Sequence, residues 1–147
     1  MEKCRFPLWA EIPDLGLYMD QVVTFIGRIY APICGPDVKG LLSPAMVNNY
    51  VKARIIPKPQ GKKYSREQIA LLVMIVALKQ AVTMEDIRAL LALRPDETPE
   101  EQYTAFCQRF SADIEALDVS PGKALEHAIH AAAHRAACVM ALGGIRE

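Results

Sequence analysis

The chain has 147 residues, of which 52% are hydrophobic and 23% are charged. This length and composition suffice to bury the core of one ordinary domain, which excludes a disordered protein. The 17 basic and 17 acidic side chains cancel, so a role at nucleic acids or at a membrane surface has to rest on local charge rather than on net charge.

The sequence predicts a cytoplasmic protein with no membrane partner. The segment from Met1 to Asp14 lacks the apolar stretch of a secretory signal. The longest apolar run, from Ile69 to Leu78, is too short to cross a bilayer and predicts a fully buried helix instead. Four widely separated cysteines form no C-x-x-C pair and predict no disulfide framework.

The first half of the chain predicts two helices and an extended arm. The first helix follows Pro13 and ends before Pro32, because apolar residues recur between them at nearly helical spacing. Ser43 and Pro44 are an N-cap and a first helical residue, and they begin a short second helix. Residues 55–64 hold two prolines and a glycine, which is typical of a hairpin or an extended arm.

Four more helices are predicted in the second half. Ser65 caps a third helix that runs to about Gln80, and Thr83 caps a fourth that ends before Pro95. The fifth helix begins after Thr98 and the sixth after Ser120, stopping at Gly143-Gly144. One face of the fifth helix carries Tyr103, Phe106, Phe110, Ile114 and Leu117. The boundary predicted at residues 94–98 divides the chain into a head, residues 1–94, and a two-helix tail, residues 95–147.

Charge is segregated along the chain. Between Val38 and Arg66 the sequence has no acidic residue. The basic residues of that stretch are Lys39, Lys52, Arg54, Lys58, Lys62, Lys63 and Arg66. Soluble surfaces usually mix both signs, so a basic stretch that includes a helix indicates contacts with phosphates. The alternative is that these lysines only keep an exposed loop soluble.

The second helix, the arm and the third helix together have the parts of a winged helix-turn-helix. Asn48, Asn49 and Lys52 face outward if Val47 and Tyr50 pack inward. Asparagine pairs with adenine edges, and lysine contacts guanine or phosphate. The alternative is that these side chains form the ordinary solvated face of a helix.

Three motifs in this region resemble the MerR regulator family. Residues 43–50, Ser-Pro-Ala-Met-Val-Asn-Asn-Tyr, followed by Arg54-Ile-Ile-Pro57, resemble its recognition helix and exit turn. Residues 62–65, Lys-Lys-Tyr-Ser, resemble the end of its wing, and residues 81–87 resemble the start of its next helix. The similarity covers residues 43–93.

The whole chain also resembles the bacterial domain-of-unknown-function family numbered 1836. The segments that carry this resemblance are Leu-Tyr-Met-Asp-Gln at 17–21, Asn-Asn-Tyr-Val-Lys at 48–52 and Lys-Tyr-Ser-Arg-Glu at 63–67.

The resemblances imply a mainly α protein whose head is a MerR-like winged helix-turn-helix with a small β wing, followed by a C-terminal helical pair. They imply a transcription regulator that binds double-stranded DNA, usually as a homodimer on an inverted repeat. The expected DNA-binding residues are Ser43, Asn48, Asn49, Lys52, Arg54, Lys58, Lys62, Lys63, Tyr64 and Arg66. The family's usual recognition-helix arginine is replaced here by Asn48. The alternative is a protein-interaction module on a winged-helix scaffold that does not bind DNA.

The sixth helix offers a second, less specific pattern. His130 and His134 are one turn apart and could share a metal ion. We favour the interpretation that they lie on the solvated side of the helix, opposite the apolar face with Leu125, Ile129 and Met140. The alanine-rich ridge of this helix fits either dimerisation or packing onto the head.

No enzyme, cofactor or metal is expected, because the sequence has no glycine-rich phosphate loop, nucleophile elbow or paired carboxylates in a strand context.

Overall fold

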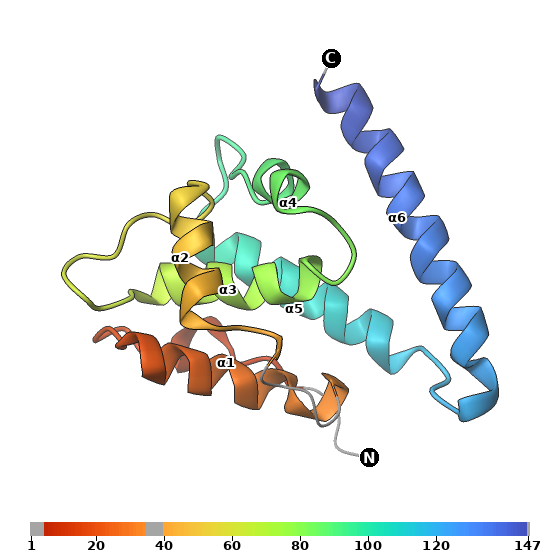
Figure 1. The fold of residues 1–147 in the computed structure, drawn as a ribbon, viewed down its shortest axis with the longest axis horizontal. Helices are drawn as coiled ribbons and strands as arrows, with labels where there is room; N and C mark the ends of the chain where they lie inside the picture. Colours follow the sequence, from red (N-terminus) through yellow and green to blue (C-terminus); the bar gives the residue numbers. More distant parts are fainter. Residues whose placement is uncertain (1–4, 35–39, 147) are drawn as a thin grey trace.

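A computed structural model describes residues 5–34 and 40–146, and this part of the chain is mainly helical (Figure 1). Cys4 and Lys39 lie outside the described residues. A short 3-10 turn, η1 (Trp9–Glu11), comes first. The helices that follow are α1 (Met19–Cys34), α2 (Pro44–Lys52), α3 (Arg66–Leu78), α4 (Met84–Leu90), α5 (Pro99–Glu115) and α6 (Ala124–Arg146), the last preceded by η3 (Pro121–Lys123).

Four predicted helix starts, those of α2, α3, α4 and α5, are confirmed by their caps. The side chains of Ser43, Ser65, Thr83 and Thr98 each accept a hydrogen bond from the backbone N–H three residues on, at 3.1–3.3 Å. At Ser65 the side chain of Gln68 accepts a bond from the Ser65 N–H at 2.7 Å in return, which completes a capping box.

α1 begins at Met19, later than the start predicted after Pro13, and the start predicted after Ser120 is a 3-10 turn without a side-chain cap, so that α6 begins at Ala124.

Two predicted helix ends are wrong. α1 continues through Pro32 to Cys34. Because Pro32 lies in the last turn, its missing N–H costs a single helical hydrogen bond. α6 continues through Gly143 and Gly144, neither of which has the left-handed backbone of a helix-ending glycine.

Helix α3 is the centre of the core, as the apolar run predicted. Ile69, Leu72, Val73 and Ile75 are fully buried. α1 packs against α3, and the Tyr30 hydroxyl on α1 donates to the carbonyl of Val73. The Lys79 ammonium, just after α3, donates to the carbonyl of Leu41, and burial lowers its pKa. These bonds fix α1 and the turn before α2 onto α3.

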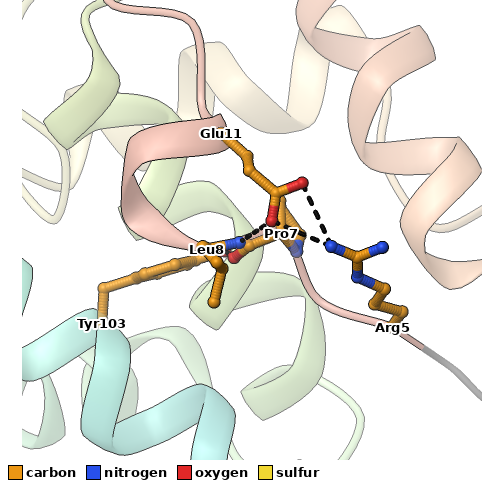
Figure 2. A network of polar contacts seen from close by, with 5 residues as sticks. All are labelled: Arg5, Pro7, Leu8, Glu11 and Tyr103. Carbon is orange, nitrogen blue, oxygen red and sulfur yellow. Dashed lines mark hydrogen bonds and ion pairs between the residues drawn. The ribbon is translucent and has the colours of Figure 1, made fainter.

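The N-terminal segment is held against α5 by a polar network (Figure 2). The Tyr103 hydroxyl donates to the carbonyl of Pro7 at 2.7 Å. The Glu11 carboxylate accepts from the Leu8 N–H at 3.0 Å and pairs with Arg5 at 3.2 Å. Tyr103 is buried, which strongly raises its pKa.

Helix α5 belongs to the same core as the helices before it. It packs along α3, and the Phe110 ring meets the Phe6 ring edge-on at 5.3 Å. On the predicted apolar face, Tyr103 is buried and Phe110 is half-buried, whereas Leu117 lies beyond the helix end and is 51% exposed. The packing of α5 onto the head is one of the two arrangements expected for the tail.

The break in the packing lies between α5 and α6. α6 contacts α4 and stands apart from the other helices (Figure 1). Along α6 only Leu142 is buried among the residues whose side chains are described. Leu125, Ile129 and Met140 are 73%, 57% and 78% exposed. The apolar face of this helix, which was expected to be buried, is therefore exposed, because none of the described residues covers it.

Strand pairing is sparse. In residues 5–34 and 40–146 it consists of two isolated bridges, Leu17 with Tyr64 and Gln60 with Lys63. Among the same residues, no helix combines the length and the apolar character that a membrane-spanning segment needs.

Candidate nucleic-acid interface

Helix α2 has one buried face and one exposed polar face. Val47 and Tyr50 are 0% and 5% exposed, and burial raises the pKa of Tyr50. Asn48, Asn49 and Lys52 are all exposed, as the inward packing of Val47 and Tyr50 predicted. The outward face of this nine-residue helix thus carries two amides and one cation.

The end of α2 places an arginine where glycine is usually found. The Arg54 N–H donates to the Val51 carbonyl at 3.0 Å, and the Ile55 N–H donates to the Tyr50 carbonyl at 3.1 Å. This pair of bonds is a Schellman motif, which needs a left-handed residue after the helix. Arg54 supplies it with φ 60°, at a steric cost that glycine would not incur. Its side chain is exposed.

The arm between α2 and α3 is anchored at both ends. At its start, Ile56 is 1% exposed and the Gln68 amide donates to the Pro57 carbonyl at 2.9 Å. At its finish, Leu17 and Tyr64 exchange backbone hydrogen bonds of 3.0 and 2.8 Å. Between these anchors the arm projects beyond the helices as the yellow loop in Figure 1, with a turn at Gly61, φ 64°.

The arm and α2 present cations that no carboxylate neutralises. Within the part of the chain that the structure describes, Lys52, Arg54, Lys58 and Lys62 are exposed and form no ion pair. The Lys63 ammonium lies 5.4 Å from the centroid of the Tyr18 ring. These charges are free to contact an anionic partner.

Two of the expected DNA-binding side chains are part of the scaffold. Tyr64 is 4% exposed, so little of its surface is available to a partner. The Arg66 guanidinium donates to the carbonyls of Ile12 and Ala10 at 2.8 and 3.3 Å, and its central carbon lies 6.0 Å from the centroid of the Trp9 ring. Arg66 therefore fixes the N-terminal segment to α3.

A groove of about 1320 Å³ is lined by some of the candidate DNA-binding residues and not by others. It lies between the arm, the N-terminal segment, α3 and the turn between α4 and α5. Arg54, Lys58, Lys63 and Arg66 line it, whereas Asn48, Asn49, Lys52 and Lys62 do not. Ser43 lies at a separate hollow of about 390 Å³ between α1 and the start of α2.

The contacts of Trp9 and Leu17 were not anticipated from the sequence. Their partners, Arg66 and Tyr64, are 57 and 47 positions away along the chain (66 − 9 and 64 − 17). No local pattern marks such a pairing, because it depends on how distant segments pack.

His130 and His134 are exposed on α6. His127 is half-buried, and its Nε2 lies 2.6 Å from the Asp118 carbonyl. In the described residues no group of three or more possible metal ligands is brought together.

The sequence profile of one family, described as "Domain of unknown function (DUF1836)", matches residues 7–110. The chain belongs to this family. No curated protein and no solved structure matches the chain. The DUF1836 match takes in α1, α2, the arm, α3, α4 and most of α5, and it ends before α6. It therefore coincides with the part of the chain that shares one core.

Proposed function

We propose that this protein is a sequence-specific, DNA-binding transcription regulator built on a MerR-like winged helix-turn-helix. The observation that carries the proposal is the exposed Asn48, Asn49 and Lys52 face of α2, followed directly by an arm that is rich in cations and free of acids. Amides and cations on one short helix suit base edges and phosphates in the major groove.

In this proposal α2 enters the major groove. An α-helix with its side chains is about 10–12 Å across, which fits a groove about 12 Å wide. Asn48 and Asn49 contact base edges and set the sequence preference, while Lys52 contacts guanine or phosphate. Ser43 caps the helix, so that its first turn keeps its geometry on approach to the DNA.

The arm takes the role of the wing and binds phosphates. Arg54, Lys58, Lys62 and Lys63 supply charge without sequence information. Tyr64 and Arg66 act as positioning residues, because they hold the end of the arm against the N-terminal segment.

Selection of genomic fragments by the purified protein at physiological salt tests the proposal. Enriched fragments should share a motif, and the logarithm of the binding constant should fall by about 0.9 per neutralised phosphate for each tenfold rise in salt. The double variant Lys62→Glu with Lys63→Glu should weaken binding to all sequences alike, while Asn49→Ala should change the preferred motif.

A matched control is the double variant Arg109→Glu with Lys123→Glu, which makes the same change in charge on α5 and η3. It should leave the affinity within about twofold. Equal losses in both double variants, or binding that does not respond to salt, would favour the alternative, a protein-interaction module on the same scaffold.

We also propose that a second copy of the chain covers α6. The helix is about 35 Å long, and helices in proteins gain most of their stability from the packing of an apolar face. Its exposed side carries a seam in which residues alternate at spacings of four and three, as in paired helices. The seam consists of Leu125, Ile129, Ala132, Ala136, Val139 and Gly143.

The central alanines of this seam allow two helices to approach closely, while Ile129 and Val139, exposed by 57% and 45%, lie to either side of them. The side that carries half-buried His127 and buried Leu142 points away from the seam, so the seam is open to a second molecule. A two-fold dimer of this kind would present two copies of α2, as an inverted repeat requires.

A further inference from the structure

The groove beside the arm is lined by both apolar and cationic side chains. Half-buried Leu71 and Leu91 and 47% exposed Leu93 come from α3 and from the turn after α4. Arg54 and Lys58 come from the connection between α2 and α3. A lining of this kind fits a molecule that has an apolar part and a negatively charged part.

The charges of the groove favour an anion. Its lining holds four cations, Arg54, Lys58, Lys63 and Arg66, and two acids, Asp14 and Glu67. Arg66 lies 3.9 Å from Asp14, which leaves three cations against the single carboxylate of Glu67. The excess positive charge is on the arm.

Arg54 gives an independent reason to expect a ligand here. A non-glycine residue with φ 60° is strained, and such strain is concentrated at binding sites. Its backbone role in the Schellman motif would be filled better by glycine. Arginine at this position adds a guanidinium group that lines the groove, and glycine has no such group.

We propose that this groove binds a free amphipathic anion, an aliphatic carboxylate whose chain lies along Leu71, Leu91 and Leu93 and whose head group is held by Arg54 and Lys58. The volume of about 1320 Å³ exceeds the range of about 300–1000 Å³ that is common for small-molecule sites, so an extended chain has room.

The same cations would then serve two ligands. Arg54, Lys58 and Lys63 are also the phosphate contacts of the proposed regulator, so a bound carboxylate would lower the affinity for DNA. This consequence rests on the proposed function, whereas carboxylate binding itself does not.

Trp9 provides a direct readout, because it is the sole tryptophan of the chain and lines the groove. The full-length protein is titrated with octanoate, decanoate, acetate and neutral decanol, and the emission of Trp9 is followed. Decanoate should give a saturable change. Since each buried methylene contributes about 0.8 kcal/mol, or about fourfold, decanoate should bind more than tenfold more tightly than octanoate, and acetate should give no change.

Variants then locate the site. Leu93→Asp and Arg54→Gln should each weaken decanoate binding at least fivefold, while Arg54→Lys should largely preserve it. Leu90→Asp is the matched control, because Leu90 is 38% exposed on α4 and does not line the groove. Leu117→Asp is a second control, because Leu117 is 51% exposed beyond the end of α5 and does not line the groove, and both variants should bind decanoate normally.

The result that overturns the inference is an equal affinity for decanol and decanoate, or binding that survives Leu93→Asp, or binding that is lost in Leu117→Asp. Binding to anionic phospholipid vesicles without binding to free decanoate also overturns it. If decanoate binds as expected and no DNA is bound at any salt concentration, the groove is a carboxylate site and the proposed function is the part that fails.

Discussion

Replacing Arg54 with glycine should stabilise the fold and weaken DNA binding at the same time. A side chain in the left-handed region costs about 1–2 kcal/mol, and Arg54 has φ 60°. Glycine avoids this cost but loses about 0.5–1 kcal/mol through the greater freedom of the unfolded chain. Because the Arg54 side chain is exposed, little packing is lost. The midpoints of these two ranges differ by about 0.75 kcal/mol, so the free energy of unfolding should rise by about that amount, which corresponds to about 2 °C in Tm for a chain of this length.

Urea unfolding and fluorescence anisotropy with a selected DNA fragment measure the two effects. In Arg54→Gly the salt dependence should lose about one phosphate, a decrease of about 0.9 in slope. Arg54→Lys keeps the charge and the backbone cost, so both measurements should stay close to those of the unaltered protein. A lower Tm in Arg54→Gly would refute the argument from backbone strain, and an unchanged salt slope would refute the contact with phosphate.

Three further perturbations test other parts of the structure. Ile129→Glu with Met140→Glu on α6 should convert the proposed dimer to a monomer in light scattering and abolish the dependence of Tm on protein concentration, and an unchanged mass would reject α6 as the interface. Gly16 has φ 86°, and a Cβ at this position would lie 3.0 Å from the Lys63 Cβ. Gly16→Ala should therefore destabilise the fold by at least about 1 kcal/mol and displace the arm. An unaltered midpoint of urea unfolding would contradict this prediction. Burial raises the pKa of three tyrosines above 10.0, so the folded state keeps protons that the unfolded state releases, and the contribution of these tyrosines to stability should be constant below pH 10 and fall above it. These tyrosines are Tyr50, Tyr64 and Tyr103. The measurement is urea unfolding between pH 8 and pH 11.5, and a urea midpoint that did not move with pH would exclude a link between tyrosine ionisation and stability.

The helix starts could be predicted from sequence because their stabilising contacts are local. A cap such as Ser65 acts on Gln68, three residues away, and the pattern of residue types records that contact directly. The exposed face of α2 followed in the same way from the alternation of Val47 and Tyr50 with two asparagines.

Features that depend on packing between residues far apart in the sequence could not be predicted. α5 joins the core because Phe110 meets Phe6 and Tyr103 bonds to Pro7, and neither contact leaves a local signature. The apolar side of α6 was expected to be buried, because an amphipathic helix usually packs its apolar side against another part of the same chain. Residues 5–34 and 40–146 provide no partner for that side, so Leu125 and Met140 are exposed. The groove was missed for the same reason, since its walls come from four separate segments.

The anchoring of the arm at Pro57 and Tyr64 also affects the thermodynamics of any association. Restricting the backbone of one free residue costs about 1–2 kcal/mol at room temperature. Because both ends of the arm are already fixed, this penalty applies to residues 58–63 alone, rather than to the whole connection from α2 to α3. Most of the ordering entropy is therefore lost when the chain folds, and the lysines at the tip meet their partner from a loop that is largely preorganised.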